Sequence, residues 1–395
     1  MQPLFQLSLA LAVPLCTASS LLNASVENGQ LTVNGVSSPL APTWSALNGV
    51  VSKYFTPLGP SGAQNKTLVN SSFFSYLLLN GGSWLADVPL VLAPSLVLVL
   101  NDVDISPSAN FAPFRGMIEI NSTDYAGVVS PSGPTGARFS CPNASVSPAA
   151  VWAVDSSNTV VEGLSIYGCG RGEGGAVHLQ GSPGAWGHTC SGATIFNNRI
   201  WNASRAIWLE TISGVTIDSN EVFNNSGHAI DFDAFSHQSV ATNNNIYGNF
   251  GREGVFIEQA AVGITIANNS IGPGNGNGVA VFNNDMNTTT GPHCIVANKI
   301  FGNLNAGISM GSTAPRAGTP DVGVLIAGNL VYENGPQGRR QGYHTNGAQI
   351  GTRYACNRNS DGVSLFTQSA EFKVREGRGG LFPPQAPSLF HPSHP

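Results

Sequence analysis

The feature that most constrains this chain is a three-residue motif, Asn-x-Ile/Val, which recurs in its second half. Successive copies begin 22, 24, 25, 29 and 31 residues apart, and an aromatic residue follows the motif in five of the six copies. A period in this range, with several short β-type segments per repeat, predicts a solenoid in which each repeat forms one coil. The copies are Asn198-Arg-Ile200, Asn220-Glu-Val222, Asn244-Asn-Ile246, Asn269-Ser-Ile271, Asn298-Lys-Ile300 and Asn329-Leu-Val331.

The segments between the copies decide the type of solenoid. They are short and apolar, whereas a helical repeat would show apolar residues at a 3.6-residue period. The Leu-x-x-Leu-x-Leu frame of leucine-rich repeats is also absent. We therefore predict an all-β fold, a parallel β-helix solenoid over residues 84–351 in which the six motif asparagines stack as an Asn ladder at one corner. Alternation along the strands assigns these side chains to the core: Val177, Leu179, Ile207, Leu209, Ile230, Phe232, Val255, Ile257, Val279, Val281, Ile308 and Met310.

The remaining segments differ from the repeat. Residues 1–18 hold an apolar run followed by small residues, as in a secretory signal peptide, and residues 19–83 are expected to form an irregular segment and cap. Residues 352–395 lose the repeat, end in a Pro-rich stretch and are expected to be a disordered tail. Cys169 and Cys190 are the expected disulfide pair. Sequons typical of a secreted glycoprotein begin at nine positions: Asn23, Asn65, Asn70, Asn121, Asn143, Asn202, Asn224, Asn268 and Asn287.

Charge and composition narrow the class of partner. Charged residues make up only 10% of the chain and the formal net charge is −5, with no basic run of the kind that binds nucleic acid. No later segment reaches the roughly 18 uninterrupted apolar residues that a membrane-spanning helix needs. We therefore expect a secreted, extracellular monomer with no nucleic-acid partner and no membrane partner.

The same alternation predicts which side chains face outward. Adjacent coils of a β-helix lie about 4.8 Å apart, so outward residues in register nearly touch. Glu210, Asp233 and Glu258 would then form a row of carboxylates, which is destabilising unless a cation or a raised pKa compensates. This row is the predicted metal site, with Ca²⁺ as the candidate cofactor. The two predicted columns are His178, Trp208, Asp231, Phe256, Ala280, Ser309 and Gln349, and Gln180, Glu210, Asp233, Glu258 and Phe282.

Basic side chains at the ends of the same strands complete the candidate site. Histidines beside acids are candidate general bases, and arginines beside them could bind a substrate carboxylate. Trp208 and Phe256 flank Asp231, as aromatic side chains that stack on sugars would. The predicted catalytic residues are His228, Asp231, Asp233, Arg205, Arg252 and His178.

The repeat resembles the right-handed parallel β-helix of the pectin-lyase-like superfamily, most clearly over residues 150–351. That superfamily contains polysaccharide lyases, polysaccharide hydrolases, uronate epimerases and non-catalytic surface proteins. Asp231-Phe232-Asp233 is similar in arrangement to the outward acids that calcium-dependent lyases of the superfamily use. The resemblance implies a secreted enzyme with a polysaccharide substrate, a lyase or epimerase acting on a uronate-containing glycan.

Two alternatives remain open at the level of sequence. One is a glycoside hydrolase in which an Asp pair acts as acid and base, because Gly227-His228-Ala229 partly resembles the Gly-His-Gly of polygalacturonases. The other is a non-catalytic glycan-binding surface β-solenoid that uses the acids and aromatic side chains without turnover. The enzymatic hypotheses require that the acidic side chains take part in catalysis, and the binding hypothesis does not.

Overall fold

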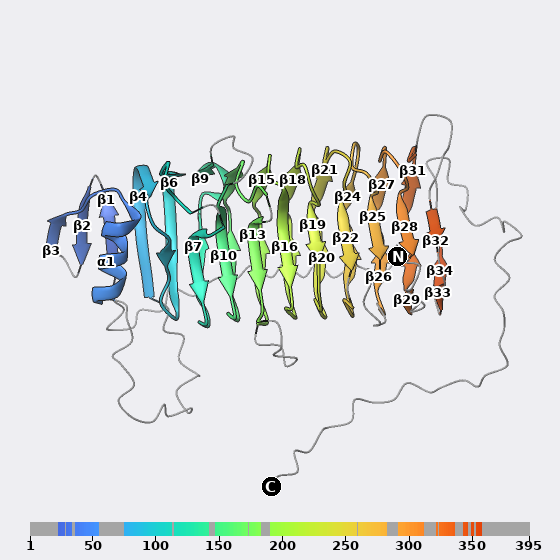
Figure 1. Cartoon of the computed structure of the whole chain (residues 1–395), viewed down its shortest axis with the longest axis horizontal. Helices are drawn as coiled ribbons and strands as arrows, with labels where there is room; N and C mark the ends of the chain where they lie inside the picture. The colour runs from blue at the N-terminus through green and yellow to red at the C-terminus, as the bar shows by residue number, and fades with distance from the viewer. Residues whose placement is uncertain are drawn as a thin grey trace, which may run out of the picture.

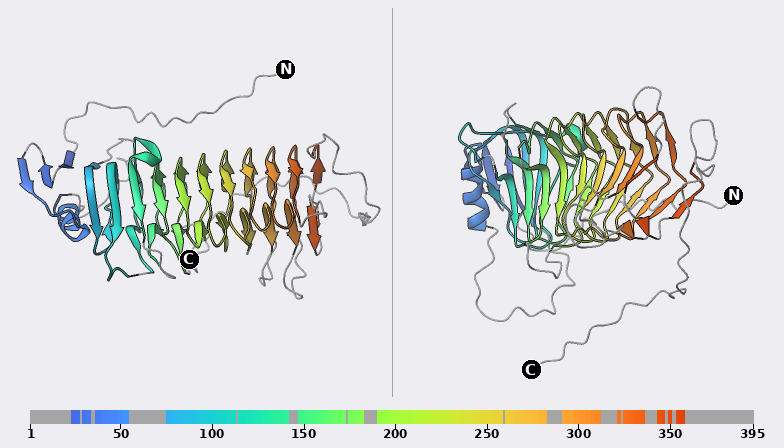
Figure 2. Two further views of the ribbon diagram at one scale, coloured as in Figure 1. Left: turned by 90° about the horizontal axis from the view of Figure 1, so that it is seen from above. Right: turned by 45° about the vertical axis from the view of Figure 1, so that its right-hand side comes forward.

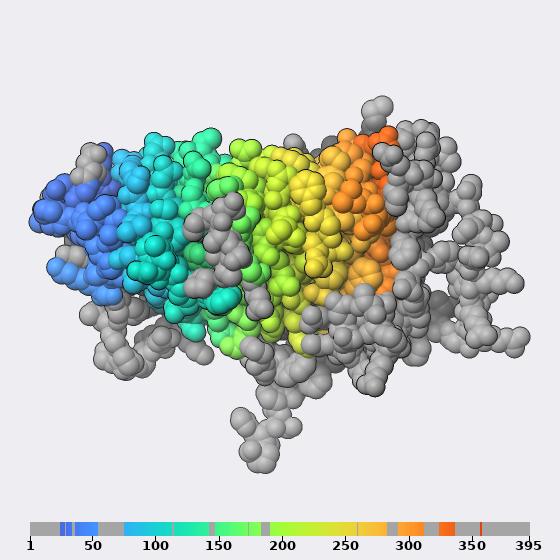
Figure 3. All heavy atoms as spheres, turned by 45° about the horizontal axis from the view of Figure 1, so that its top comes forward, coloured from blue at the N-terminus to red at the C-terminus, as the bar shows by residue number. Residues whose placement is uncertain are grey.

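The computed structural model is a long rod built from stacked coils (Figure 1, Figure 3). The predicted signal peptide and most of the predicted tail lie outside the residues that it describes. Within those residues no helix has the length and apolar character that crossing a bilayer requires. The described residues are 23–27, 29–33, 36–54, 75–112, 114–141, 147–172, 174–182, 190–258, 260–282, 291–311, 321–322, 324–335, 343–346, 349–350 and 353–357.

The described coils form a ten-stranded sheet and a 22-stranded sheet that run along the rod (Figure 1, Figure 2). Beyond β6 (Leu96–Pro107), which pairs with strands of both series, the parallel strands of the larger sheet run as two series. We call the ten-stranded sheet the first sheet and these two series the second and third sheets. The first sheet contains β5 (Leu90–Val91), β7 (Gly116–Asn121), β10 (Ala149–Val154), β13 (Gly175–Gln180), β16 (Arg205–Glu210), β19 (Ile230–Phe232), β22 (Val255–Glu258), β25 (Val279–Phe282), β28 (Ile308–Gly311) and β32 (Tyr343–Asn346). The second contains β8 (Gly127–Val129), β11 (Val160–Glu162), β14 (Thr194–Phe196), β17 (Thr216–Asp218), β20 (Val240–Thr242), β23 (Thr265–Ala267), β26 (Cys294–Val296), β30 (Leu325–Ala327) and β34 (Arg353–Ala355). The third contains β9 (Ala137–Ser140), β12 (Ser165–Tyr167), β15 (Arg199–Trp201), β18 (Glu221–Phe223), β21 (Asn245–Tyr247), β24 (Ser270–Ile271), β27 (Lys299–Phe301) and β31 (Leu330–Tyr332).

The space between the three sheets is one continuous apolar core. All twelve side chains that the alternation assigned to the core are buried within it, which confirms the predicted register of the first sheet. Strand pairing agrees, because Ile207 pairs with Ile230 and Ile230 with Val255 in successive coils. The outward residues of these strands therefore also lie in register along the rod.

The predicted asparagine ladder is present at the corner between the second and third sheets. Each motif asparagine donates a side-chain hydrogen bond to the Oδ1 atom of the next, at 2.9–3.0 Å, and the series continues one coil further, to Asn357. The residue before a ladder asparagine adopts positive φ in several coils, as at Asn197, Asn243 and Asn268, and this turns the chain into the third sheet. We name this set the first ladder: Asn198, Asn220, Asn244, Asn269, Asn298, Asn329 and Asn357.

A second asparagine ladder, which the sequence analysis missed, occupies the corner between the third and first sheets. Its side chains are buried and are joined by amide–amide hydrogen bonds of 2.8 Å. In four of its five members the asparagine lies five residues after a motif asparagine, so the signal was present in the repeat. The second ladder consists of Asn225, Asn249, Asn275, Asn303 and Asn334.

The N-terminal end of the rod is covered by a small cap. Strands β1 (Asn23–Glu27), β2 (Gln30–Val33) and β3 (Val36–Pro39) pair antiparallel, and helix α1 (Trp44–Tyr54) packs against the first coil (Figure 1). Parallel pairing begins here, where β1 pairs with the long strand β4 (Ser75–Ala86) and β4 pairs with β6 (Leu96–Pro107). At the other end β34 pairs with β30. The coils therefore extend beyond both predicted bounds, residues 84 and 351, because these outer coils lack the Asn-x-Ile/Val motif.

Three short elements lie outside this scheme. The 3₁₀ helix η2 (Gly133–Thr135) precedes β9, and β29 (Asp321–Val322) pairs with β33 (Gln349–Ile350).

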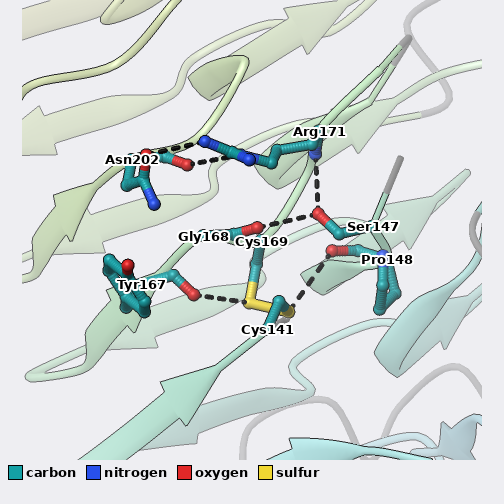
Figure 4. The surroundings of a disulfide bond; sticks show 8 residues. All are labelled: Cys141, Ser147, Pro148, Tyr167, Gly168, Cys169, Arg171 and Asn202. Carbon is teal, nitrogen blue, oxygen red and sulfur yellow. Dashed lines mark hydrogen bonds between the residues drawn. A yellow bond between two sulfur atoms is a disulfide. The ribbon is translucent and has the colours of Figure 1, made fainter. Parts of the chain in front are cut away.

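The predicted disulfide between Cys169 and Cys190 is wrong: Cys169 pairs with Cys141 (Figure 4). Cys141 follows β9 and Cys169 follows β12, its parallel neighbour in the third sheet, so adjacent coils bring their Cα atoms to 5.0 Å. Cys190 precedes β14 on another side of the coil, and its sulfur lies 3.3 Å from the carbonyl oxygen of Gln180. Position within the coil, and not closeness in sequence, decides the pairing.

Candidate functional site

The outward side of the first sheet carries the predicted candidate site. Strand pairing places His178, Trp208, Asp231 and Phe256 in one column, as predicted, and Ala280 and Ser309 continue it. The prediction that Gln349 is the last member of this column is wrong, because Ser309 pairs with His344 in β32. The coil after β28 is longer than the earlier ones, so counting along the repeat overshot this strand. We call the series that ends in Phe256 the middle column.

Three carboxylates of the first sheet form one buried cluster. Asp231, Asp233 and Glu258 each place a carboxylate oxygen within 4.8 Å of the other two. Asp231 is 0% exposed and the other two are almost as deeply buried. Oxygens bound to one Ca²⁺ at 2.3–2.6 Å lie at most about 5 Å apart, so this donor set fits a calcium ion. We call Asp231, Asp233 and Glu258 the acid cluster.

The acid cluster differs from the predicted row in one member, since Asp231 takes the place of Glu210. Strand β19 ends at Phe232, so Asp233 lies past the strand, where the register with Glu210 is no longer maintained. Trp208 Nε1 donates to Asp233 Oδ2 at 3.0 Å. Glu210 instead accepts a hydrogen bond from Gln180 Nε2 at 2.9 Å.

The predicted pairing of Arg205 with the acids is formed at Asp231. Arg205 Nε lies 3.2 Å from Asp231 Oδ2, and its guanidinium carbon lies 4.2 Å from the centre of the Trp208 ring. The contact is a charge pair without an aligned hydrogen bond, and Asp231 Oδ1 has no hydrogen-bond donor among the described residues. One oxygen of Asp231 is therefore compensated by charge, and the other has no partner among the described residues.

Burial dominates the ionisation of Asp231. It raises the pKa of this carboxyl well above the usual range for Asp. The charge of Arg205 opposes that effect, while Asp233 and Glu258 add to it by repulsion between like charges. Asp231 therefore holds a proton at pH values where an ordinary carboxyl has lost it, unless a cation binds beside it.

His178 lies in a stack of aromatic rings within the middle column. Its ring is stacked between Trp152, at 5.3 Å, and Trp208, at 4.1 Å between ring centres. Burial lowers the pKa of His178, and the nearby Glu210, whose Oε2 lies 3.9 Å from Nε2, only partly offsets that effect. The imidazole is consequently neutral near neutral pH and able to accept a proton.

His228 has an acidic partner that the sequence analysis missed. Its Nδ1 atom lies 2.8 Å from Glu253 Oε2, and its ring stacks on Phe256 at 4.5 Å. Arg205, His228 and Glu253 occupy equivalent positions of three successive coils, just before the middle column. We call the series Arg205, His228, Glu253 and Asn277 the leading column.

The structure differs from the predicted site at Arg252 and at the two aromatic rings, Trp208 and Phe256. Arg252 lies on the turn before β22 with its side chain exposed, and no charge pair between it and the acid cluster occurs among the described residues. Trp208 has His178 and Arg205 against its ring, and Phe256 is buried beneath His228. Both aromatic rings hold neighbouring side chains in place, so they do not offer a free face for stacking on a sugar.

Comparison with known proteins identifies the fold. The sequence matches a family model described as "Right handed beta helix region" over residues 119–291 and 155–354, which together span more than half of the chain. The A-module of the mannuronan C-5 epimerase AlgE4 from Azotobacter vinelandii is similar in structure, with a TM-score of 0.55, 18% sequence identity, and coverage of 72% of this chain and 71% of that one. The Dettilon tailspike protein has a TM-score of 0.50, 13% identity, and coverage of 72% and 56% respectively. The search of curated proteins finds no match. At these identities the likeness to solved structures shows the fold alone, and the right-handed coil expected from the sequence is confirmed.

Proposed function

The chain belongs to the right-handed β-helix region family, and we propose that it is a secreted enzyme that acts on a uronate-containing polysaccharide as a lyase or epimerase. The observation that carries the proposal is the acid cluster, three buried carboxylates beside Arg205 and two histidines on one outward face. Packed carboxylates destabilise a fold, so a patch of this kind points to a ligand that compensates them. The similar fold of a mannuronan C-5 epimerase module agrees with this substrate class.

The excess of acidic side chains on the outward face of the first sheet favours a bound cation. Asp233, Glu258 and Glu253 outnumber Arg205, so an anionic polymer would be repelled without an added positive charge. Asp231, Asp233 and Glu258 would hold Ca²⁺, which would supply positive charge beside the carboxylate of a bound uronate. Arg205, partly exposed next to Asp231, can contact the same carboxylate from the protein side.

Both reactions begin when a base removes the proton from the carbon next to the uronate carboxylate. A histidine, His228 or His178, would accept that proton. In elimination, the glycosidic C–O bond then breaks, a carbon–carbon double bond forms, and the leaving oxygen takes up a proton from an acid. In epimerisation, a proton returns to the same carbon from the opposite face. With Ca²⁺ bound, Asp231 would be ionised and solvent water would supply that proton. Without a cation, burial keeps Asp231 protonated, so it then suits the role of acid.

A glycoside hydrolase is the second candidate, and one observation favours it. Asp231 combines a raised pKa with a neighbouring carboxylate, Asp233, whose oxygen lies within 4.8 Å of its own. A protonated acid beside an ionised one is the arrangement of glycosidases, and a short separation suits a retaining mechanism, which needs about 5–5.5 Å. This reaction requires no cation, so a chelator separates it from the calcium-dependent reading.

Secretion is part of the proposal. The disulfide Cys141–Cys169 is a bond that oxidising compartments maintain and the cytosol does not. Sequons at Asn224 and Asn268 lie at exposed positions of the coil. Residues 1–18 would then direct export as a signal peptide.

The test is to incubate the protein with a panel of uronans and neutral glycans, with Ca²⁺ or with a chelator. A rise in ultraviolet absorbance identifies a lyase, altered anomeric signals in NMR without cleavage identify an epimerase, and new reducing ends without absorbance identify a hydrolase. Asp231→Asn should abolish the activity, whereas Glu221→Gln, which changes an acid on the third sheet, should retain it. Retention of a glycan without any product would overturn the enzymatic proposal in favour of a binding protein.

A further inference from the structure

We propose that Glu253 is a positioning residue, which fixes His228 with a proton on Nδ1 and leaves Nε2 as the base of the reaction. The inference rests on the proposed function and deepens it, because it selects one of the two candidate bases. It draws on the leading column, which is distinct from the acid cluster. Glu253 is not among the residues that the sequence analysis selected.

The coil geometry puts Glu253 beside His228. The backbone amide of Ala206 donates to the carbonyl of His228, and that of Ala229 donates to the carbonyl of Glu253. Successive members of the leading column therefore occupy the same position of successive coils, about 4.8 Å apart. Alternation alone would point residues three positions before the middle column to the opposite face. Contacts show that they lie on the outward face, because Arg205 lies over the Trp208 ring and His228 stacks on Phe256.

The contact itself determines where the proton lies. Nδ1 of His228 and Oε2 of Glu253 are 2.8 Å apart, although the ring N–H is not squarely aligned with the oxygen. Two lone pairs repel at that distance, so one of the two atoms carries a proton. Burial raises the pKa of Glu253, but the contacts with His228, with the backbone of Glu253 and with Asn277 together outweigh burial and lower it. Glu253 is thus the carboxylate and Nδ1 carries the proton.

Neighbouring side chains hold the pair from both sides. Asn277 Nδ2 donates to Glu253 Oε1 at 3.2 Å, and Asn277 Oδ1 in turn accepts the backbone N–H of Ala306 at 3.0 Å. Phe256 stacks on the His228 ring with an angle of 21° between the planes. The ring plane and its Nδ1 edge are both fixed, which directs Nε2 away from Glu253.

The charges around His228 match a base that becomes positive during the reaction. Arg205 lies one coil before it and Glu253 one coil after it, while Asp231 and Glu258 lie on the strands beside it. When Nε2 accepts the substrate proton, the imidazolium that forms is stabilised by the Glu253 carboxylate. No oxidant or further reactant is required, because the proton passes on to solvent or back to the substrate.

His178 lacks an equivalent partner. Its closest acid, Glu210, lies 3.9 Å from Nε2 and is engaged by Gln180. A protonated His178 would also face Arg205, which further lowers its pKa. His228 is therefore the better base, and His178 acts within the aromatic stack.

The test compares Glu253→Gln with Glu221→Gln, a matched change at an acid that pairs with Arg199 on the third sheet. The ring ¹⁵N shifts of His228, assigned by their loss in His228→Asn, report its tautomer without any substrate. The wild type should show the Nδ1–H form, and Glu253→Gln should show a mixture, because an amide can either accept or donate. A wild-type Nε2–H tautomer would overturn the proposal.

Kinetics on the substrate found for the wild type give the second readout. Glu253→Gln should lower kcat by about 10- to 100-fold with KM nearly unchanged, and should move the acidic limb of the pH profile to lower pH. Glu253→Asp should recover part of the loss, and Glu221→Gln should match the wild type. A folded Glu253→Gln protein with wild-type kcat and pH profile would also refute the role. If the wild type turns over no glycan, the proposed function fails while the tautomer still decides the pairing.

Discussion

The first ladder and the acid cluster both bury polar side chains that lie side by side in successive coils. They differ in whether these buried groups find hydrogen-bond partners within the protein. Each ladder amide donates to one neighbour and accepts from the other, so the stack satisfies itself. Carboxylates only accept, so a stack of them cannot. Asp231 Oδ1 accordingly has no donor among the described residues, and the pKa of its carboxyl is raised by burial.

This difference distinguishes buried polar side chains that stabilise the fold from buried polar side chains that serve a function. A complementary column stabilises the coil and needs nothing from outside. A column of like charge persists only if a proton, a cation or a substrate completes it. Variants that break the ladder should therefore lose stability, and variants that relieve the acid cluster should lose function.

The largest effect is expected from breaking the first ladder at its centre. Asn244→Leu removes the amide that accepts from Asn220 and donates to Asn269 and to the carbonyl of Ile217. Leaving these buried groups without partners should lower the free energy of unfolding by roughly 3–5 kcal/mol. Urea denaturation measures it. Asn245→Leu makes the same change at the exposed neighbouring position, and an equal loss there would contradict a specific role of the ladder.

Calcium should have the next largest effect, and only at the acid cluster. Saturation at about 100 times Kd should stabilise the wild type by about 2.7 kcal/mol. Asp233→Asn should abolish that increment and the activity while the β-helix stays folded, because one of the three clustered carboxylates is lost. Asn245→Leu should keep it. Denaturation with calcium and with chelator measures the increment, and calorimetry measures binding directly. An unchanged increment in Asp233→Asn would move the ion elsewhere.

The ladder and the core were predictable because they repeat. Six copies of one motif fix a period, and alternation within a strand then fixes which side chains point inward, as at Ile230 and Phe232. The second ladder carries the same period and could have been found five residues after the motif. The disulfide could have been found by position in the coil, since Cys141 and Cys169 both follow strands of the third sheet.

The candidate site was less predictable because it depends on where strands end. Glu210 was grouped with Asp233 on the assumption that β19 continued, but the strand stops at Phe232. Glu253 was missed because the columns were counted only within the strand interiors, whereas it precedes β22. The raised pKa of Asp231 depends on burial by neighbours from other coils, which no local pattern in the sequence encodes.

A smaller effect on stability is expected at His293, a buried side chain with only one of its two ring nitrogens hydrogen-bonded among the described residues. Its Nδ1 accepts the backbone N–H of Ile264 at 3.2 Å, while Nε2 has no partner among the described residues. Burial lowers the pKa of His293 from 6.5 to about 3. The unfolded chain therefore binds a proton first, so this contribution to stability is present above pH 6.5 and is lost as pH falls toward 3. At pH 5 the loss should be about 2 kcal/mol.

His293→Ser is the variant that tests this. Ser239 already fills the equivalent position of an earlier coil, where its Oγ accepts the backbone N–H of Val215 at 3.1 Å. The variant should keep that hydrogen bond and lose part of the acid sensitivity between pH 7 and pH 5. Denaturation midpoints of both proteins across that range measure it, and parallel curves would assign the acid sensitivity to other groups.

The smallest stability effect should have the opposite sign, and it lies in the acid cluster. Because the folded-state pKa of Asp231 is raised above 3.8, the folded protein keeps a proton that the unfolded chain releases. Stability is thus lost as pH rises above that value until the folded-state pKa is passed. Asp231→Asn removes this dependence, so without calcium it should melt a few degrees higher at pH 7, by about the shift that 1 kcal/mol produces, and should differ less at pH 4.

The same variant should lose at least about 100-fold in activity, because one of the three carboxylates of the acid cluster is lost. Added calcium should then reverse the order of stability, since the wild type gains the binding increment and Asp231→Asn does not. Asp104→Asn, an exposed change on β6, should alter neither quantity. Melting curves at pH 4 and pH 7, each with calcium and with chelator, distinguish the two assignments. If Asp231→Asn is instead destabilised at pH 7 without calcium, Arg205 alone compensates the charge of Asp231. The Arg205–Asp231 pair would then be structural, as the first ladder is.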